Sequence, residues 1–507
     1  MSEKRIKSAL ISVYYKDELD EIVRILDELK VKIYSTGGTF GFIKDLGIPA
    51  ETVESLTTYP SILGGRVKTL HPSVFGGILA RRNNTEDIEQ LNKYKIPEID
   101  LVIVDLYPFE KTVQSVDDEE EIIEKIDIGG ISLIRAAAKN FNDVLVVSGR
   151  DQYHRLLTLL KEKKGITSLD DRKYYAAEAF KTSSNYDTAI FKYFNRSAGI
   201  EVFRESLNTS YPLRYGENPH QKGIYFGDQD KLFDKLHGKE ISYNNFLDID
   251  AAFGLIDEFD ETTYLIIKHN NACGAASRTN PADAWKDALA CDPVSAYGGV
   301  IAANEPVGEE EAAEIDKIFF EIIIAPAFTD KALDILRQKK NRIILRRKKK
   351  AGNQYYFRSL LDGVLWQDKD ISTESASDMR PVTKKVPAPA EVEDLVFANK
   401  IVKHSKSNAI VLAKNKQLCA SGIGQTSRVD ALKQAIEKAH TFGFDLKGSV
   451  MASDAFFPFA DCVEIAYKAG VTSIVQPGGS VRDKDSIDFC SANGVAMVFT
   501  GKRHFKH

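Results

Sequence analysis

Apolar and polar positions alternate with two different periods along the first part of the chain. Short runs rich in β-branched residues have the character of strands, and they fall at residues 9–15, 32–38, 100–109 and 143–149. Between and after these runs, apolar residues recur at helical spacing in residues 18–30 and 174–194. Strands that alternate with helices in this way predict a parallel sheet covered by helices.

The alternation returns after a polar segment at residues 195–208. Two strand candidates, residues 263–270 and 407–415, begin similar units. The clearest helical faces of this second part lie at residues 282–290, 428–439 and 461–470. We therefore predict an α/β protein with three domains, which comprise residues 1–199, 200–370 and 371–507.

Composition narrows the class of protein. A chain of 507 residues exceeds what one hydrophobic core supports, while 43% apolar and 28% charged residues are typical of soluble globular domains. The net charge of -5 gives no reason to expect a nucleic-acid partner. A basic run from Arg337 to Lys350 is a local exception, which we interpret as a solvated face rather than a site for a polyanion.

Cysteine usage and hydropathy indicate the compartment. The five cysteines are odd in number and form no C-x-x-C pair, as expected of reduced thiols. The apolar stretch near the N-terminus is too short for a signal peptide, and no segment approaches the roughly 18 apolar residues of a membrane span. We expect a cytoplasmic protein without a membrane partner.

Polar side chains gather where the strands of the first part are expected to end. Ser35, Thr36 and Gly37 follow one strand and precede a helix, so their hydroxyl and backbone N–H groups could hold a phosphate. An ordinary helix cap is the alternative interpretation. Further along, a glycine-flanked segment brings together Arg66 and Lys68 with Thr69 and His71.

Three more candidates follow in the same part. Tyr107 comes after an apolar strand, Asp127 precedes a Gly-Gly turn, and Lys139 lies on the helix after that turn. Each has a structural or surface role as its alternative. Together with Lys68 they would supply proton donors and acceptors from four strand-end loops.

In the second part, the apolar run at residues 264–267 ends abruptly in Lys268 and His269. A histidine takes up a proton near neutral pH and a lysine stabilises an oxyanion, so the pair suits acid–base catalysis, with an ordinary exposed strand end as the alternative. The stretch DAFFPF places Phe457 among three phenylalanines beside a carboxylate, which suits a flat ring, although aromatic residues more often belong to a core.

These motifs resemble one family. STGGT, GGRVKTLHP, LYPF, IDIGG and LIRAAAKN are similar to the IMP cyclohydrolase domain of bifunctional purine-biosynthesis enzymes. LRYGENPHQ, KHNNACG, KSNAIV, ASDAFFPF and RHFKH are similar to the formyltransferase half of the same enzymes, so the resemblance reaches the last residue. So many motifs in one order are specific, although Ala272, Phe75 and Phe141 depart from the family pattern.

The resemblance implies a role for each motif residue. The residues on catalytic positions are Lys68, Tyr107, Asp127, Lys139, Lys268, His269 and Asn408. The residues on substrate-binding positions are Ser12, Lys16, Ser35, Thr36, Gly37, Arg66, Thr69, Arg214, Tyr215 and Phe457.

The resemblance also implies fold, reaction and partners. We expect a methylglyoxal-synthase-like, doubly wound first domain and a formyltransferase half made of two cytidine-deaminase-like subdomains. The expected reactions are formyl transfer from 10-formyltetrahydrofolate to aminoimidazole carboxamide ribotide (AICAR), and cyclodehydration of the product to IMP. The expected partners are nucleotide and folate substrates and a second copy of the chain in a homodimer.

Two other readings stay open at this point. The first part could be a nucleotide-binding regulatory module beside a working formyltransferase, or the whole chain could be a ligand-binding scaffold. A zinc deaminase would need H-x-E and P-C-x-x-C ligands, but asparagines follow His269 and no cysteines are paired. We therefore predict no catalytic metal, while a potassium ion is compatible with the resemblance.

Overall fold

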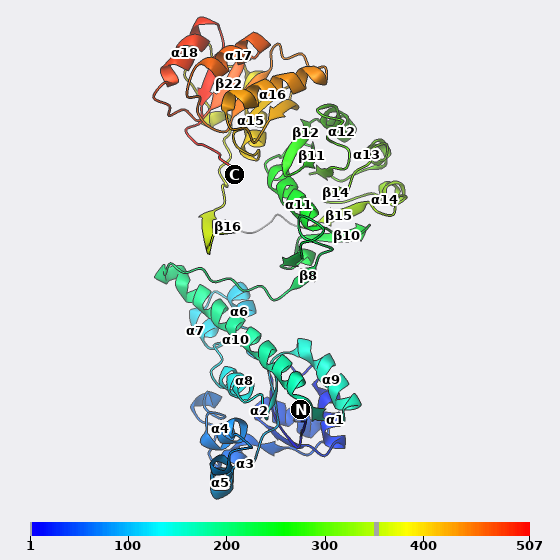
Figure 1. The fold of residues 1–507 in the computed structure, drawn as a ribbon, viewed down its shortest axis with the longest axis vertical. Helices are drawn as coiled ribbons and strands as arrows, with labels where there is room; N and C mark the ends of the chain where they lie inside the picture. Colours follow the sequence, from blue (N-terminus) through cyan, green and yellow to red (C-terminus); the bar gives the residue numbers. More distant parts are fainter. Residues whose placement is uncertain (1–2, 349–353) are drawn as a thin grey trace. The chain divides into compact units, whose positions relative to one another are not determined.

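The computed structural model describes residues 3–348 and 354–507 and divides into two compact units. The first unit comprises residues 1–208 and the second residues 209–507. Each unit has its own main sheet (Figure 1). Each also has its own hydrophobic cores. Among the described residues, no helix is both long enough and apolar enough to cross a bilayer.

The first unit is built on a five-stranded parallel sheet in the order β4-β3-β2-β5-β6. Its strands are β2 (Ser8–Ser12), β3 (Lys32–Ser35), β4 (Glu51–Thr52), β5 (Leu101–Val104) and β6 (Leu145–Val147). Alternate strand residues enter two different cores, as the two-residue period of a strand requires. The predicted parallel sheet is therefore confirmed for this unit.

Helices cover both faces of this sheet. The helices of one face are α1 (Leu19–Glu28), α2 (Gly37–Asp45) and α9 (Tyr153–Glu162). The helices of the other face are α4 (Pro72–Leu79), α8 (Gly129–Lys139) and α10 (Leu169–Ala198). Smaller helices complete the unit: α3 (Val53–Thr57), α5 (Thr85–Lys93), α6 (Phe109–Ser115) and α7 (Glu119–Ile123). β1 (Lys4–Arg5) pairs with β7 (Ile166–Thr167) outside the main sheet.

The second unit contains a twelve-stranded mixed sheet in which one arrangement occurs twice. The strand order is β10-β15-β14-β13-β11-β12-β20-β19-β21-β22-β23-β18. The first copy consists of α11 (Tyr243–Ile256), β11 (Thr263–Lys268), β12 (Asn271–Ser277), α12 (Pro281–Ala290), β13 (Val300–Ala303), α13 (Glu309–Ile315), β14 (Ile322–Ala325), α14 (Asp330–Leu336) and β15 (Ile343–Arg347). The second consists of α15 (Pro389–Lys403), β19 (Ile410–Lys414), β20 (Gln417–Gly422), α16 (Arg428–Thr441), β21 (Val450–Ser453), α17 (Asp461–Ala469), β22 (Ser473–Gln476), α18 (Asp483–Ala492) and β23 (Ala496–Phe499).

Packing follows the repeat. Helices α11 and α15 share one core with strands of both copies. On the other face, α12 to α14 cover the first copy and α16 to α18 cover the second. The remaining strands are β8 (Ser210–Pro212), β9 (Ile224–Phe226), β10 (Phe233–His237), β16 (Tyr355–Leu360), β17 (Gly363–Asp368) and β18 (Arg380–Pro381). The two copies meet where β12 pairs with β20.

The basic run is only in part the solvated face that the sequence suggested: Arg337, Lys339, Lys340 and Lys348 are exposed, but the middle of the run is built into the sheet. Residues 343–347 form β15, which lies inside the sheet between β10 and β14. Arg342 is fully buried and pairs with Asp316, and Arg346 pairs with Asp234 at 2.6 Å. These charges are satisfied within the unit, because acidic residues distant in sequence face them. Lys349 and Lys350 lie outside the described residues.

All five cysteines are buried, and burial raises each thiol pKa to about 12. Because the thiolate is the reactive form, we expect no reaction of the folded protein with a disulfide reagent at pH 8. The same reagent should titrate five thiols in denaturant. Rapid labelling of even one thiol in the native protein would contradict this burial.

Candidate active sites

The first candidate site lies at the carboxyl edge of the parallel sheet, where β2, β3 and β5 end. Ser12 and Thr36 share a hydrogen bond of 2.8 Å between their hydroxyl oxygens. Thr36 precedes α2, and its side chain makes no capping hydrogen bond to that helix. Ser35 is fully buried, and its hydroxyl donates to the Ile11 carbonyl at 2.8 Å, so it joins β3 to β2. Gly37 begins α2 with a φ of 40°, a value that favours glycine.

Lys16 lies at the same edge. Its Nζ donates to the carbonyl oxygens of Val13 at 2.6 Å and Tyr14 at 2.9 Å. Burial lowers the pKa of Lys16, the Asp105 carboxylate opposes that effect, and the charge of Lys68 adds to it. Two cations that influence each other at this edge suit an anion such as a phosphate.

Asp127 and Tyr107 stand beside these cations. The Asp127 carboxylate accepts the Gly130 backbone N–H at 2.6 Å, at the start of α8. Burial raises the pKa of Asp127, whereas its hydrogen bonds and the charge of Lys68 act in the other direction. Burial and the Asp127 charge raise the pKa of Tyr107, so its hydroxyl is protonated and can donate at neutral pH.

The loop at residues 59–71 contacts the start of α8. The Thr69 hydroxyl lies close to Gly129, the first residue of α8. A Cβ atom added at Gly129 would lie 3.0 Å from the Thr69 hydroxyl oxygen. Arg66 forms an ion pair with Glu124, and both side chains are exposed. His71 has a structural role, because its Nδ1 accepts the Ser73 N–H and caps α4.

Lys139 is the one catalytic candidate of the first unit that this site does not contain. It is exposed at the last position of α8, ten residues after Gly129, and ten residues of helix span about 15 Å. Its neighbour Asn140 donates to the carbonyls of Ile78 and Ala80. Lys139 therefore lies at the end of α8 that points away from Asp127.

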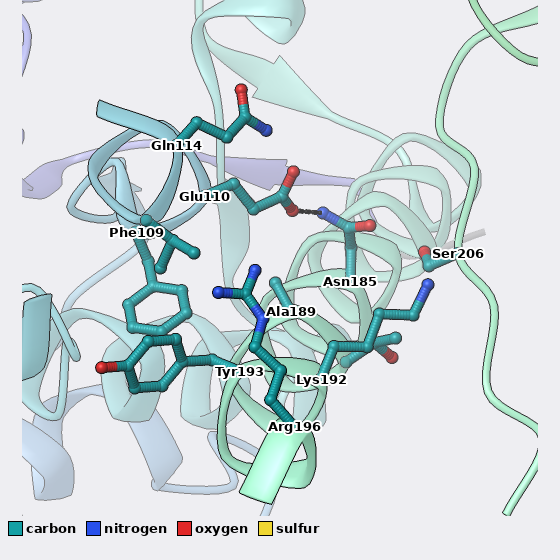
Figure 2. Close-up of a pocket in the computed structure, with 11 residues that line it drawn as sticks. Phe109, Glu110, Gln114, Asn185, Ala189, Lys192, Tyr193, Arg196 and Ser206 are labelled. Carbon is teal, nitrogen blue, oxygen red and sulfur yellow. Dashed lines mark hydrogen bonds between the residues drawn. The ribbon is translucent and has the colours of Figure 1, made fainter. Parts of the chain in front are cut away.

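A separate cavity of about 210 Å³ lies between α6, the C-terminal half of α10 and Ser206. Figure 2 shows Asn185 donating to Glu110 across its wall, a hydrogen bond of 2.8 Å. Lys192 pairs with Glu205 at 2.6 Å. None of the residues on predicted catalytic or substrate-binding positions lines this cavity, so we do not assign it to the reaction.

The second candidate site begins at the hairpin between β11 and β12. His269 and Asn270 form its two-residue turn, and both have positive φ, 50° and 66°. A turn of this kind accepts few residue types, and histidine and asparagine are among them. Asp248 on α11 accepts the Asn270 N–H at 2.7 Å, and its raised pKa reflects burial, opposed by that hydrogen bond and by the charges of His269 and Lys268.

Lys268 and the neighbouring residues are tied to both copies. Lys268 Nζ donates to the Tyr297 carbonyl at 2.7 Å. The Asn271 side chain accepts the Lys406 N–H at 2.9 Å, so the hairpin contacts the segment that contains Asn408. Since β12 and β20 are antiparallel, the start of one strand lies beside the end of the other.

Asn408 lines a cavity of about 530 Å³ in the second copy. Its side chain accepts from Arg428 at 2.9 Å and donates to the Gln425 carbonyl at 2.8 Å. Arg428 is buried and also pairs with Asp454, which is fully buried. The other lining residues include three aromatic side chains and one cation: Phe456, Phe459, Phe505 and Arg503.

Of the sequence-predicted residues of the second unit, only Asn408 lines this cavity; Lys268 and His269 lie at the β11–β12 hairpin outside its lining, and three more residues are also absent from it. Phe457 is fully buried in the core beneath it, so its neighbours Phe456 and Phe459 face the space that we expected Phe457 to face. Arg214 and Tyr215 lie between β8 and β9, with the guanidinium 5.5 Å from the phenol ring centre. Conversely, sequence reasoning missed Arg428, Arg503 and Phe505 as lining residues.

The structure is that of an α/β protein with a candidate acid–base site in each unit, and comparisons with known proteins give the family. The model of the AICARFT/IMPCHase bienzyme matches residues 137–438, and that of the MGS-like domain matches residues 18–132. The bifunctional purine biosynthesis protein PurH of Bacteroides thetaiotaomicron is 64% identical over 508 residues, which is 100% of both chains. The protein of the same name from Acetivibrio thermocellus is 47% identical over 99% of this chain and 100% of its own.

The chain belongs to the AICARFT/IMPCHase bienzyme family. It is a bifunctional formyltransferase and IMP cyclohydrolase, and these activities are the final two steps of IMP synthesis. The α/β fold with an MGS-like first domain is confirmed as well. Among residues 3–348 and 354–507, no group of three or more His, Cys, Asp or Glu side chains is placed to hold a metal ion.

Proposed function

We propose that the second unit transfers a formyl group from 10-formyltetrahydrofolate to the amine of AICAR, and that the first unit closes the ring of the product with loss of water. The main support is the placement of Lys268 at the end of β11 and of His269 in the tight turn that follows, beside Asp248 and joined through Asn271 to the segment that contains Asn408. This arrangement holds a base and a cation at fixed positions, and the Asn271 hydrogen bond to Lys406 links their hairpin to the segment whose Asn408 lines the cavity.

In formyl transfer, we assign His269 the role of base. The amine of AICAR is a weak nucleophile, because its lone pair is delocalised into the imidazole ring. As its nitrogen bonds to the formyl carbon, His269 takes its proton, and it returns a proton to the departing folate nitrogen. Lys268 uses one donor for the Tyr297 carbonyl, which leaves two for the oxyanion of the tetrahedral intermediate.

In cyclisation, Asp127 and Tyr107 act on the same tetrahedral centre. The carboxamide nitrogen attacks the formyl carbon and loses a proton, for which Asp127 is the acceptor. Tyr107 donates to the formyl oxygen, which leaves as water after protonation. Lys68 stabilises the charge that develops between them. A role for Lys139 would require a second copy of the chain, since within one chain it lies at the distant end of α8.

The remaining residues are proposed to hold the nucleotides. In the first unit, the start of α2 at Thr36 and Gly37, together with Lys16 and the Ser12 hydroxyl, suits the phosphate. In the second, Phe456, Phe459 and Phe505 suit flat rings, and Arg428 and Arg503 suit anionic groups.

We also infer the division of the second unit into two cytidine-deaminase-like subdomains near residue 370. Support comes from the repeated order of elements. The first copy ends with β15 at Arg347, and β18, which begins at Arg380, pairs with β23 at the edge of the second copy. A cytoplasmic location is inferred from the buried, unpaired cysteines, which need no oxidising compartment.

The direct test of this function is the product mixture. Purified protein given AICAR and 10-formyltetrahydrofolate should produce IMP, and chromatography should detect the formylated ribotide only as a transient species. If the reaction stopped at the formylated ribotide, the first unit would have no catalytic role. If AICAR were not consumed, the assignment of the second unit would fail.

A homodimer is the proposed assembly, and the hairpin of β16 and β17 is its proposed contact. An isolated two-stranded hairpin is marginally stable in water. This one exposes large apolar side chains, among them Leu361 at 97%, Leu365 at 57% and Trp366 at 54%. Such a cluster is typical of a surface that another chain covers.

Replacing Leu361 and Leu365 together with aspartate should weaken the dimer without unfolding the chain, because both side chains are exposed. We expect the dissociation constant from sedimentation to rise at least about tenfold, the equivalent of roughly 1.4 kcal/mol. Val481→Asp changes an equally exposed apolar residue elsewhere in the same unit and serves as the control. An unchanged dimer in the hairpin variant would rule out this contact.

A further inference from the structure

The last residues of the chain are part of the second unit and not a frayed end. Arg503 and Phe505 line the cavity that contains Asn408. His504, between them, is only 4% exposed. This alternation is that of an extended segment, in which successive side chains point to opposite sides. One side of the tail therefore faces the cavity and the other side faces the interior.

His504 is held at both ring nitrogens by carboxylates. Its Nδ1 lies 2.6 Å from Asp370 and its Nε2 lies 2.8 Å from Glu374. A carboxylate only accepts, so both nitrogens carry protons and the ring is an imidazolium. The backbone N–H of His504 donates to the backbone carbonyl of Asp454 at 3.0 Å. The side chain of the same Asp454 forms the ion pair with Arg428.

The carboxylates are themselves fixed. Glu374 is 2% exposed and accepts from the Asn399 side chain at 2.9 Å. The other charged groups that face this cluster are Lys502, whose Nζ lies 3.8 Å from Glu374, and Lys403, whose charge acts on Asp370. The cluster thus joins the tail to residues 370–374 and to α15.

A second anchor holds the tail beside Asn408. The Ser407 N–H donates to the Lys506 carbonyl at 2.9 Å, and the Lys506 N–H donates to the Ser407 hydroxyl at 3.2 Å. Two fixed points, one at residue 504 and one at residue 506, leave little freedom for the side chains between and beside them.

We propose that His504 is a positioning residue for formyl transfer, which clamps the C-terminal tail between Asp370 and Glu374 so that Arg503 and Phe505 complete the substrate cavity. The inference rests on the proposed function, in which this cavity holds the formyltransferase substrates. His504 itself faces away from the cavity and touches no substrate.

The clamp has a defined pH dependence. Burial alone would lower the pKa of His504, but hydrogen bonds and charges from Asp370 and Glu374 raise it to about 9, above the ordinary value of 6.5. A histidine with a raised folded-state pKa stabilises the fold fully below pH 6.5, and that contribution is lost as the pH rises through about 9. The tail should therefore loosen at alkaline pH.

The test compares His504→Ala with wild type by steady-state kinetics of both activities in the same preparation. We expect the KM for AICAR in formyl transfer to rise about 10- to 10²-fold, with a change in kcat below about threefold, because misplaced binding groups weaken substrate binding. Cyclisation should be unchanged. His440→Ala, which alters an exposed histidine on α16, is the matched control.

A double-mutant cycle separates positioning from a general structural effect. If His504 acts through Arg503 and Phe505, then His504→Ala added to Arg503→Ala/Phe505→Ala should change the KM by less than about threefold. An equal effect in both backgrounds would overturn the inference. If Arg503→Ala/Phe505→Ala left formyl transfer unchanged, the cavity would not be the substrate site, and the proposed function would fail independently of His504.

A conservative variant covers the case in which His504→Ala does not fold. Glu374→Gln keeps an acceptor for the ring and removes one charge. The pH at which the KM for AICAR begins to rise should then move from about 9 toward 6.5. If the KM for AICAR began to rise at the same alkaline pH in this variant as in wild type, the clamp would be contradicted.

Discussion

His269→Asn should lower the kcat of formyl transfer by about 10²- to 10⁴-fold, the usual contribution of a positioned base, while the hairpin keeps its shape. The reason lies in the backbone. Position 269 has a φ of 50°, so a substitution such as His269→Val would disturb the turn as well as the chemistry. Asparagine tolerates this conformation but cannot take up the proton of the amine.

The second copy of the repeat shows that asparagine fits such a turn. Its β19–β20 hairpin has Asn415 and Lys416 at the two turn positions, with φ of 53° and 51°. Asp394, the sixth residue of α15, accepts both turn N–H groups at 2.8 and 2.6 Å, as Asp248, the sixth residue of α11, accepts that of Asn270. The two turns share a frame, and only the first has a histidine.

That frame supplies the control for the measurement. Asn415→Ala perturbs the corresponding turn of the second copy and should leave formyl transfer within about threefold of wild type, since no reacting group lies there. Circular dichroism and cyclisation activity check that both variants fold. Wild-type formyl transfer by His269→Asn would remove the histidine from the mechanism and leave Lys268 as the only candidate of the pair.

Local sequence patterns were sufficient to predict the helices and strands, but not which side chains pair with residues that are distant in sequence. The parallel sheet of the first unit follows from alternating strands and helices, because each pattern is local. Arg342 and Arg346 could not be placed in this way. Their partners Asp316 and Asp234 are 26 and 112 residues distant in sequence, so nothing near the basic run shows that its charges are paired.

Two placements could have been derived more closely from the sequence. Lys139 is twelve residues after Asp127, and a continuous helix after the Gly-Gly turn carries it about 15 Å from that end. In DAFFPF, adjacent side chains point to different sides, so the three phenylalanines cannot all face a ligand. Which of them enters the core depends on α16 and α17 packing against them, and that is a tertiary contact.

In the first unit, Asp127→Asn should lower the rate of cyclisation by about 10²- to 10⁴-fold and leave formyl transfer within about twofold of wild type. Asparagine can still accept the Gly130 N–H that starts α8, so the helix is retained. The amide cannot accept the proton of the carboxamide nitrogen. Formylated ribotide should therefore accumulate to nearly the amount of AICAR consumed, which chromatography of a time course would show.

The pH profile adds a second measurement on the same variant. Burial raises the pKa of Asp127, so wild-type cyclisation should lose activity, as the pH falls, at a higher pH than an ordinary aspartate would cause. Asp127→Asn should lack this acidic limb, because the titrating group is gone. Asp118→Asn, which alters an exposed aspartate that caps α7 through the Glu121 N–H at 2.9 Å, should keep both the rate and the limb. Normal cyclisation by Asp127→Asn would instead indicate that Tyr107 and Lys68 suffice for catalysis of cyclisation. Asp127 would then serve only to begin α8.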